Sequence, residues 1–460
     1  MTLPRSQFIQ QLFWLSWYAL IFIIPFELLQ LHVLGISLRL HQLVFVLTCI
    51  LGGYAFAHHI PRVLRNTLKS IRKPWWYYQH VYIWTLLLIW LFSVIGGIRN
   101  GEDLQVTLIR SGVFLGYIGV FWLIYYGLRK KEQVDAIINI LIVSTMVVII
   151  IGVYEAIALQ WGLPDWTYNV IFDGRADSLF PEPNWFGMWL AIMTAIALPR
   201  WYQEYQIHGG LQWGWLIFFF LLIFTNILTL TRASWLATAV VVLLFVFQYL
   251  IINGWQYLKQ SLVPFVLTRV VIVILVASLL APVFSPFNLW GRAVSIVTHQ
   301  ITITETVDEE DSDNDGEKEV VRTKVSDVNV SSRILSYQQS LSLIGVYPFL
   351  GVGHAGFEEY FEEGSNPSNL FLSVFVSSGV AGGIIFLGLI YIWIKQASIF
   401  FVDHPEYANM MLGIIMAIGV VGMFNDPILM GFMWLMFGFL ARLPDLIMDE
   451  DLNHVTYEDN

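Results

Sequence analysis

Residues 213–252 read WGWLIFFFLLIFTNILTLTRASWLATAVVVLLFVFQYLII, and this stretch is the strongest guide to the fold. It contains two long apolar runs, at about 213–230 and 233–252, and its only charged residue is Arg232 between them. Each run is close to the roughly 20 apolar residues that a membrane-spanning helix needs. We therefore expect a hairpin of two spanning helices with Arg232 at its tight turn.

The composition extends this interpretation to the whole chain. Its 460 residues are 57% hydrophobic and 13% charged, with a mean hydropathy of +0.66, whereas soluble proteins carry roughly 25% charged residues. These values exclude a water-soluble enzyme and a nucleic-acid-binding protein. The single cysteine, Cys49, excludes a disulfide scaffold. The expected fold class is an all-α polytopic membrane protein.

Twelve apolar runs predict about 12 transmembrane helices. The runs lie at roughly 11–29, 35–57, 79–98, 106–127, 134–160, 184–199, 213–230, 233–252, 263–284, 369–394, 409–425 and 427–441. Clusters of Arg and Lys at 62–73 and 129–131 follow the second and fourth runs. Because cytoplasmic loops are enriched in positive charge, these loops and both chain ends are expected to be cytoplasmic.

This topology predicts five parts of the chain. They are 1–160 with helices 1–5, 161–284 with helices 6–9, an extracytoplasmic loop at 285–368, 369–442 with helices 10–12, and an acidic cytoplasmic tail at 443–460. The large loop contains an acidic insert at 305–325, expected to be disordered, and then a helical stretch at 332–346. Within the insert, DSDNDGE (311–317) has the spacing of half a calcium loop, although Arg322 occupies the twelfth position. Disorder is the favoured interpretation and calcium binding the alternative.

Arginines on the outer face are the main functional signal. Of the 24 basic residues, this topology places ten at or near that face, and three of them lie in or beside the acidic insert. The other seven are all arginine: Arg39, Arg99, Arg110, Arg175, Arg232, Arg292 and Arg333. An arginine drawn below the headgroups costs several kcal/mol, so a compensating interaction is expected. A guanidinium is well suited to phosphate because it forms planar, two-pronged contacts.

Structural roles compete with anion binding at several of these positions. Arg39 and Arg99 lie at span ends, where their side chains can reach lipid headgroups, and Arg292 can be an ordinary solvated loop residue. Arg232 has no polar loop around it, and Arg333 opens an amphipathic stretch. Anion binding is favoured for these last two residues.

Four segments together resemble the O-antigen ligase and O-antigen polymerase family, which are bacterial lipid-linked glycan transferases of the GT-C type. The segments are GRADSLFPEPNWFGMWLA (174–191), LTLTRASWLA (228–237), SSRILSYQQSLSLIGVYPFLGVGHAGF (331–357) and SNLFLSVFVSSGVAGGIIFL (368–387). The resemblance covers about residues 170–390. The first four spans are similar only in general character.

The resemblance implies a multi-pass enzyme of the bacterial inner membrane that uses neither a metal nor a cofactor. Its lipid-linked oligosaccharide donor would carry the glycan on undecaprenyl pyrophosphate. The acceptor would be lipid A core for a ligase or a second lipid-linked glycan for a polymerase. Membrane lipids would be partners, and chain-length regulator proteins are an open possibility. Ligases of the family carry a histidine where this chain has Ser368, and this departure favours a polymerase.

The chemistry of such a transfer suggests roles for residues in and near these segments. Breaking the bond to pyrophosphate moves negative charge onto the leaving group, so Arg232 and Arg333 are the expected catalytic cations. The acceptor hydroxyl needs a base, for which His354, Glu358 and Glu359 are the first candidates and Glu182 a more remote one. Single attack from the opposite face would invert the anomeric centre. The expected substrate-binding residues are Arg175, Asn184, Ser368, Asn369, Arg39 and Arg292.

A secondary transporter of a small anion is the main alternative from another class. Transporters usually show internal repeats and ionisable residues near the middle of the membrane. The two halves of this chain show no clear repeat, and the run at 233–252 contains no charge. The pattern favours chemistry at the outer surface.

Overall fold

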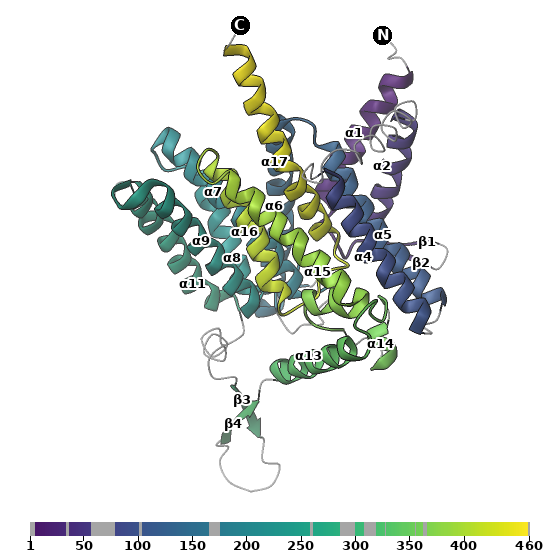
Figure 1. Cartoon of the computed structure of the whole chain (residues 1–460). Coiled ribbons are helices and arrows are strands. Elements are labelled where there is room, and N and C mark those ends of the chain that lie inside the picture. The colour runs from purple at the N-terminus through teal and green to yellow at the C-terminus, as the bar shows by residue number, and fades with distance from the viewer. Residues whose placement is uncertain are drawn as a thin grey trace.

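The structure is a computed structural model of the chain, and its described residues form a bundle of helices (Figure 1). The described residues are 5–33, 36–56, 79–100, 104–164, 175–257, 261–285, 300–307, 319–326, 328–354, 356–361 and 366–458.

Each of the twelve apolar runs coincides with a helix or with contiguous helical stretches. These are α1 (Arg5–Ile23), α2 (Leu40–Phe56), α4 (Gln79–Asn100), α5 (Leu104–Gly127), α6 (Lys131–Trp161), α7 (Pro183–His208), α8 (Trp213–Leu228), α9 (Arg232–Tyr257), the contiguous α10 (Val263–Phe265), η3 (Val266–Val271) and α11 (Ile272–Phe284), α15 (Leu370–Ile399), α16 (Pro405–Gly422) and α17 (Gly431–Glu458). Among the described residues, eight helices are long and apolar enough to cross a membrane. The all-α polytopic fold is therefore confirmed, while the number of twelve spans stays a prediction.

The elements between α11 and α15 gather at one end of the bundle. Helices α13 (Val328–Val346) and α14 (Gly356–Tyr360) and the hairpin of β3 (Gln300–Val307) and β4 (Glu319–Ser326) lie opposite both chain ends (Figure 1). The expected helix at 332–346 is thus confirmed as part of α13. We call this end of the bundle the α13 end.

Two short hairpins differ from the sequence-based expectations. Residues 36–39, expected to begin the second span, form strand β2 (Ile36–Arg39), which pairs antiparallel with β1 (Gln30–Val33). Both flanks of the acidic insert, expected to be disordered, pair as β3 and β4, and residues 308–318 lie outside the described residues. The physical reason is the polar–apolar alternation in QLHV, ISLR and ITITETV, which is typical of strands.

Helix α7 is the most deeply buried part of the bundle. Its residues from Trp185 to Pro199 are all buried, and it contacts α8, α9 and α16. At its N-terminal end, a Cβ added to Gly187 would lie 2.5 Å from the Thr231 hydroxyl and 2.6 Å from that of Ser234. The glycine therefore allows α7 to approach the α8–α9 turn closely.

The segment between α13 and α14 packs against a break in α15. Gly379 has a φ of 71° inside this helix, and a Cβ at this position would clash with the Phe349 carbonyl. Across the break, the backbone N–H of Val352 donates to Val376 at 2.8 Å, and that of Val380 donates to Pro348 at 2.7 Å. The glycines of both segments thus permit one backbone to lie directly against another.

Candidate functional site

The α8–α9 turn holds Arg232 in a network of buried polar groups. Asn226 accepts at its side-chain oxygen from the Ser234 hydroxyl at 2.7 Å and at its carbonyl from the Trp235 indole at 3.0 Å. The hydroxyl of Thr231 contacts that of Ser234 and also that of Thr229. Because these contacts join the end of α8 to the start of α9, they fix the position of Arg232, the first residue of α9.

The segment that contains Arg175 lies directly on this turn. The Arg175 Nε donates to the Thr229 carbonyl at 3.1 Å, and the backbone N–H of Ala176 donates to Leu228 at 3.2 Å. On its other side, the Glu155 carboxylate accepts from the backbone N–H of Ser178 at 2.7 Å. Arg175 is therefore anchored to the turn at Thr229, which lies three residues before Arg232 in the sequence.

Glu182 connects this segment to α13. It precedes α7 as its N-cap residue, and its Oε2 accepts from the Asn184 side chain at 3.4 Å. Burial raises the pKa of Glu182, while the hydrogen bond from Asn184 and the positive charges of Arg175 and Arg333 act to lower it. Two of the predicted arginines, from segments far apart in the sequence, thus lie close enough to Glu182 to act on its charge.

Arg333 also contacts the connection between α16 and α17. Its guanidinium carbon lies 5.9 Å from the centre of the Phe424 ring. The neighbouring Met423 carbonyl accepts from the Asn369 side chain at 2.9 Å and from the Tyr337 hydroxyl. Helices α13 and α15 therefore meet at this connection.

Asn369 and Ser368 lie at the start of α15. The Asn369 Oδ1 accepts from the backbone N–H groups of Phe371 at 2.9 Å and Leu372 at 3.0 Å, and so caps the helix. Ser368 has a φ of 51°, and its backbone N–H donates to Asn366 at 2.8 Å. Both residues shape the chain as it enters α15 beside Met423.

Asp426 is a half-buried acid that the sequence-based reasoning missed. Its carboxylate accepts from the backbone N–H of Ile428 at 3.1 Å and interacts with the Ser373 hydroxyl. Burial raises the pKa of Asp426 to about 6, although both hydrogen bonds act to lower it. A signal was available, since Asp426 is a lone acid between two apolar runs, just as Arg232 is a lone base.

His354 and Glu358 make their contacts with α5. The Glu358 carboxylate forms an ion pair with Arg110 at 2.5 Å, and the His354 ring lies 4.4 Å from the ring of Phe114. Burial and the nearby charge of Arg110 lower the pKa of His354 to about 4. Its Nε2 is buried without a hydrogen-bond partner in the described part of the chain. The imidazole is therefore neutral near pH 7.

Arg39 pairs with a buried carboxylate. Its Nη1 lies 2.6 Å from the Glu27 Oε2, and the other oxygen of Glu27 accepts from the backbone N–H of Gly431 at 2.8 Å. The adjacent Leu28 donates to Leu179 at 2.9 Å. Arg39 thus has a structural partner, while the predicted residue Arg292 lies outside the described residues.

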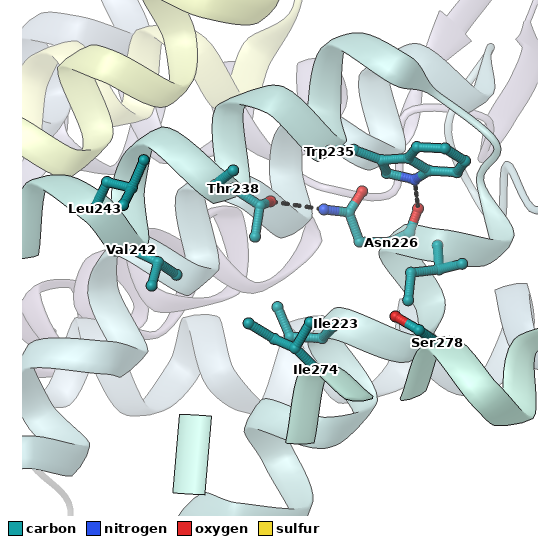
Figure 2. Close-up of a pocket in the computed structure, with 10 residues that line it drawn as sticks. Ile223, Asn226, Trp235, Thr238, Val242, Leu243, Ile274 and Ser278 are labelled. Carbon is teal, nitrogen blue, oxygen red and sulfur yellow. Dashed lines mark hydrogen bonds between the residues drawn. The ribbon is translucent and has the colours of Figure 1, made fainter. Parts of the chain in front are cut away.

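An apolar cavity of about 500 Å³ lies between α8, α9 and α11. Along α9 it begins at Trp235, about one helical turn after Arg232. Ile223, Val242 and Ile274 line it, and Trp235 lies at one end (Figure 2). Asn226 supplies polar contacts at this end, since its side chain donates to Thr238 at 2.7 Å. The cavity can hold a hydrocarbon chain whose polar end lies near the turn.

The residues therefore place two arginines and a carboxylate together beside the turn that carries a third arginine. Such a cluster can bind a polyanion and accept a proton. In the described part of the chain, no group of three or more His, Cys, Asp or Glu residues could hold a metal ion.

Comparison with known proteins adds a family to this geometry. Residues 217–387 match the family described as O-antigen ligase, and no curated protein matches the chain. The matched range includes Arg232, Arg333 and the break in α15 at Gly379, whereas Arg175 and Asp426 lie outside it. The match supports the resemblance: residues 217–387 are similar to the O-antigen ligase family, and this similarity favours a multi-pass bacterial membrane glycosyltransferase of the ligase or polymerase type.

Proposed function

We propose that this enzyme transfers a glycan from an undecaprenyl-pyrophosphate carrier to an acceptor hydroxyl at the outer face of the inner membrane. The observation that carries the proposal is that the positive charges of Arg175 and Arg333 both act on the Glu182 carboxylate. The hydrogen bond from Arg175 to the α8–α9 turn adds Arg232 to the same neighbourhood.

The arginines would bind and stabilise the leaving diphosphate. As the bond between the anomeric carbon and the phosphate oxygen breaks, its electron pair stays on that oxygen and the diphosphate gains negative charge. Donors already positioned at that point lower the barrier because they need no reorganisation. Arg232 and Arg333 are assigned the catalytic role, and Arg175 binds the same group. This chemistry needs no metal ion and no cofactor.

Glu182 is the proposed general base. The acceptor O–H would give its proton to the Glu182 carboxylate while the oxygen forms the new bond to the anomeric carbon. Because the leaving diphosphate occupies the opposite face, the transfer inverts that carbon. Asn184, which donates to Glu182, would orient the carboxylate.

His354 and Glu358 are proposed to support the site indirectly. The Arg110–Glu358 ion pair and the contact of His354 with Phe114 attach α14 to α5. In the sequence, α14 lies between the segment that packs against the break in α15 and the start of α15 itself. By holding α14 against α5, these contacts would help to orient Ser368 and Asn369 toward the substrate.

The cavity between α8, α9 and α11 is the proposed place for the isoprenoid tail. It is apolar and lies beside the turn that would hold the diphosphate. A carrier with its tail in this cavity could keep its charged end among the arginines without burying them in hydrocarbon.

Polymerisation of O-antigen or exopolysaccharide is the favoured form of the reaction, because Ser368 stands where ligases of the family carry histidine. Ligation to lipid A core is the second candidate, favoured by the description of the matching family.

Disruption of the gene tests the proposal. A polymerase predicts accumulated single repeat units, a ligase predicts polymer left on its lipid carrier, and complementation with Arg333→Ala should fail although the protein reaches the membrane. Unchanged envelope polysaccharide in the disrupted strain would refute both forms.

A further inference from the structure

A second apolar groove lies in the opposite half of the bundle from the α13 end. It has a volume of about 380 Å³ and lies between α1, α2 and α5. The residues that define it come from the N-terminal half of α1 and the C-terminal parts of α2 and α5, as Trp14, Gly53 and Trp122 illustrate. The proposed transfer site lies toward the α13 end, with Arg232 at the start of α9, Glu182 just before α7 and Arg333 in α13. This groove is therefore separate from it.

Glycines create the space in this groove. A Cβ added to Gly53 would meet nothing within 4 Å, whereas one added to Gly52 would lie 2.9 Å from the Phe13 ring. Gly53 therefore faces open space, and Gly52 allows α2 to approach α1 closely. The resulting groove is mostly apolar in its lining.

Polar groups at two levels indicate what occupies the groove. The indole N–H of Trp122 lines it and is buried without an acceptor in the described part of the chain. Farther along, the exposed Arg129 lies at its mouth, with its guanidinium carbon 5.9 Å from the centre of the Trp14 ring. Lys130 and Lys131 follow directly. An occupant should thus be apolar along its length, accept a hydrogen bond near Trp122 and end in a negative charge.

From these features we infer that the groove binds one anionic glycerophospholipid of the membrane leaflet nearest the chain ends. An acyl chain fills the space beside Gly53, an ester carbonyl accepts from Trp122, and the headgroup phosphate lies against Arg129. Basic pockets between spanning helices are suited to anionic headgroups, and long cationic side chains reach the interface readily. A zwitterionic lipid satisfies the apolar groove but lacks the net charge that Arg129–Lys131 favour.

Lipid retention by the delipidated full-length protein tests this assignment. Native mass spectrometry would compare phosphatidylglycerol with phosphatidylcholine of identical acyl chains. We expect the wild-type protein to retain phosphatidylglycerol about tenfold more strongly, which corresponds to about 1.4 kcal/mol. Equal retention of the two lipids would overturn the assignment.

Three variants locate the site. Gly53→Leu should fill the groove and reduce retention of both lipids, whereas Gly112→Leu is the matched control, since Gly112 in α5 also faces open space but does not line the groove. Arg129→Gln should abolish the preference for phosphatidylglycerol and leave binding of phosphatidylcholine unchanged. If Gly53→Leu does not fold, the Arg129→Gln result decides, and an unchanged preference in that variant would contradict the proposal.

Discussion

At the scale of single residues, the arginines predicted to lie at the outer face differ in what surrounds them. Arg39 is matched by the buried Glu27, and Arg110 by Glu358. Arg175 and Arg333 share Glu182, whose pKa burial raises despite both positive charges. A carboxylate that feels the positive charge of two nearby cations, and whose pKa is still raised by burial, is suited to proton transfer when a polyanion binds those cations.

Replacement of Glu182 tests this role. Glu182→Gln keeps the side-chain shape but removes the base, and a general base typically contributes 10²–10⁴-fold to the rate. Because protonation inactivates a base, the wild-type rate should rise with pH through the raised pKa of Glu182. Transfer assays across pH should show this acid limb in the wild type and lose it in Glu182→Gln. A variant with the wild-type rate and profile would rule Glu182 out.

At the scale of elements, the junction between α15 and the chain after α13 depends on glycine. Gly379 needs a φ of 71° and allows the Phe349 carbonyl to lie where a Cβ would be. This explains physically why the glycines of the two segments occur together. The segments must form one joint before Asn369 and Arg333 can reach the α16–α17 connection.

A methyl group at this joint should destabilise the protein. Gly379→Ala introduces both an unfavourable positive φ, about 1 kcal/mol or more, and a backbone clash. Gly388→Ala in the same helix is the control, since a Cβ there meets nothing within 4 Å. Thermal unfolding of the purified proteins should give a lower midpoint for Gly379→Ala alone. Equal midpoints would contradict the close approach described here.

The contact of α14 with α5 should make stability depend on pH. The pKa of His354 is lowered to about 4 by burial and by Arg110, so the unfolded chain binds a proton more readily than the folded protein. As the pH falls from about 6.5, the ordinary pKa of histidine, to about 4, its pKa in the folded protein, protonation therefore favours unfolding. His354→Phe should lose less stability than the wild type when unfolding is compared at pH 7 and pH 5. A larger loss in the variant would contradict the buried, neutral imidazole.

At the scale of the whole molecule, apolar run length predicted the helices well because each run must cover the same membrane thickness. The α8–α9 hairpin was found for this reason, whereas α13 was expected from the amphipathic pattern of its sequence. Asp426 and Asn226 were missed because their importance comes from burial against other helices, which the local sequence does not contain. The pairing of Arg39 with Glu27 was missed for the same reason, and the β3–β4 hairpin because composition outweighed the alternation in its flanks.

Binding of the carrier tests the central claim, that Arg175, Arg232 and Arg333 hold a diphosphate. The measurement is the affinity of the purified protein for undecaprenyl pyrophosphate and for undecaprenyl monophosphate. We expect tighter binding of the diphosphate by the wild type and a loss of about 1.5–3 kcal/mol for each arginine changed to alanine. Wild-type affinity for the diphosphate in all three variants would contradict the central claim.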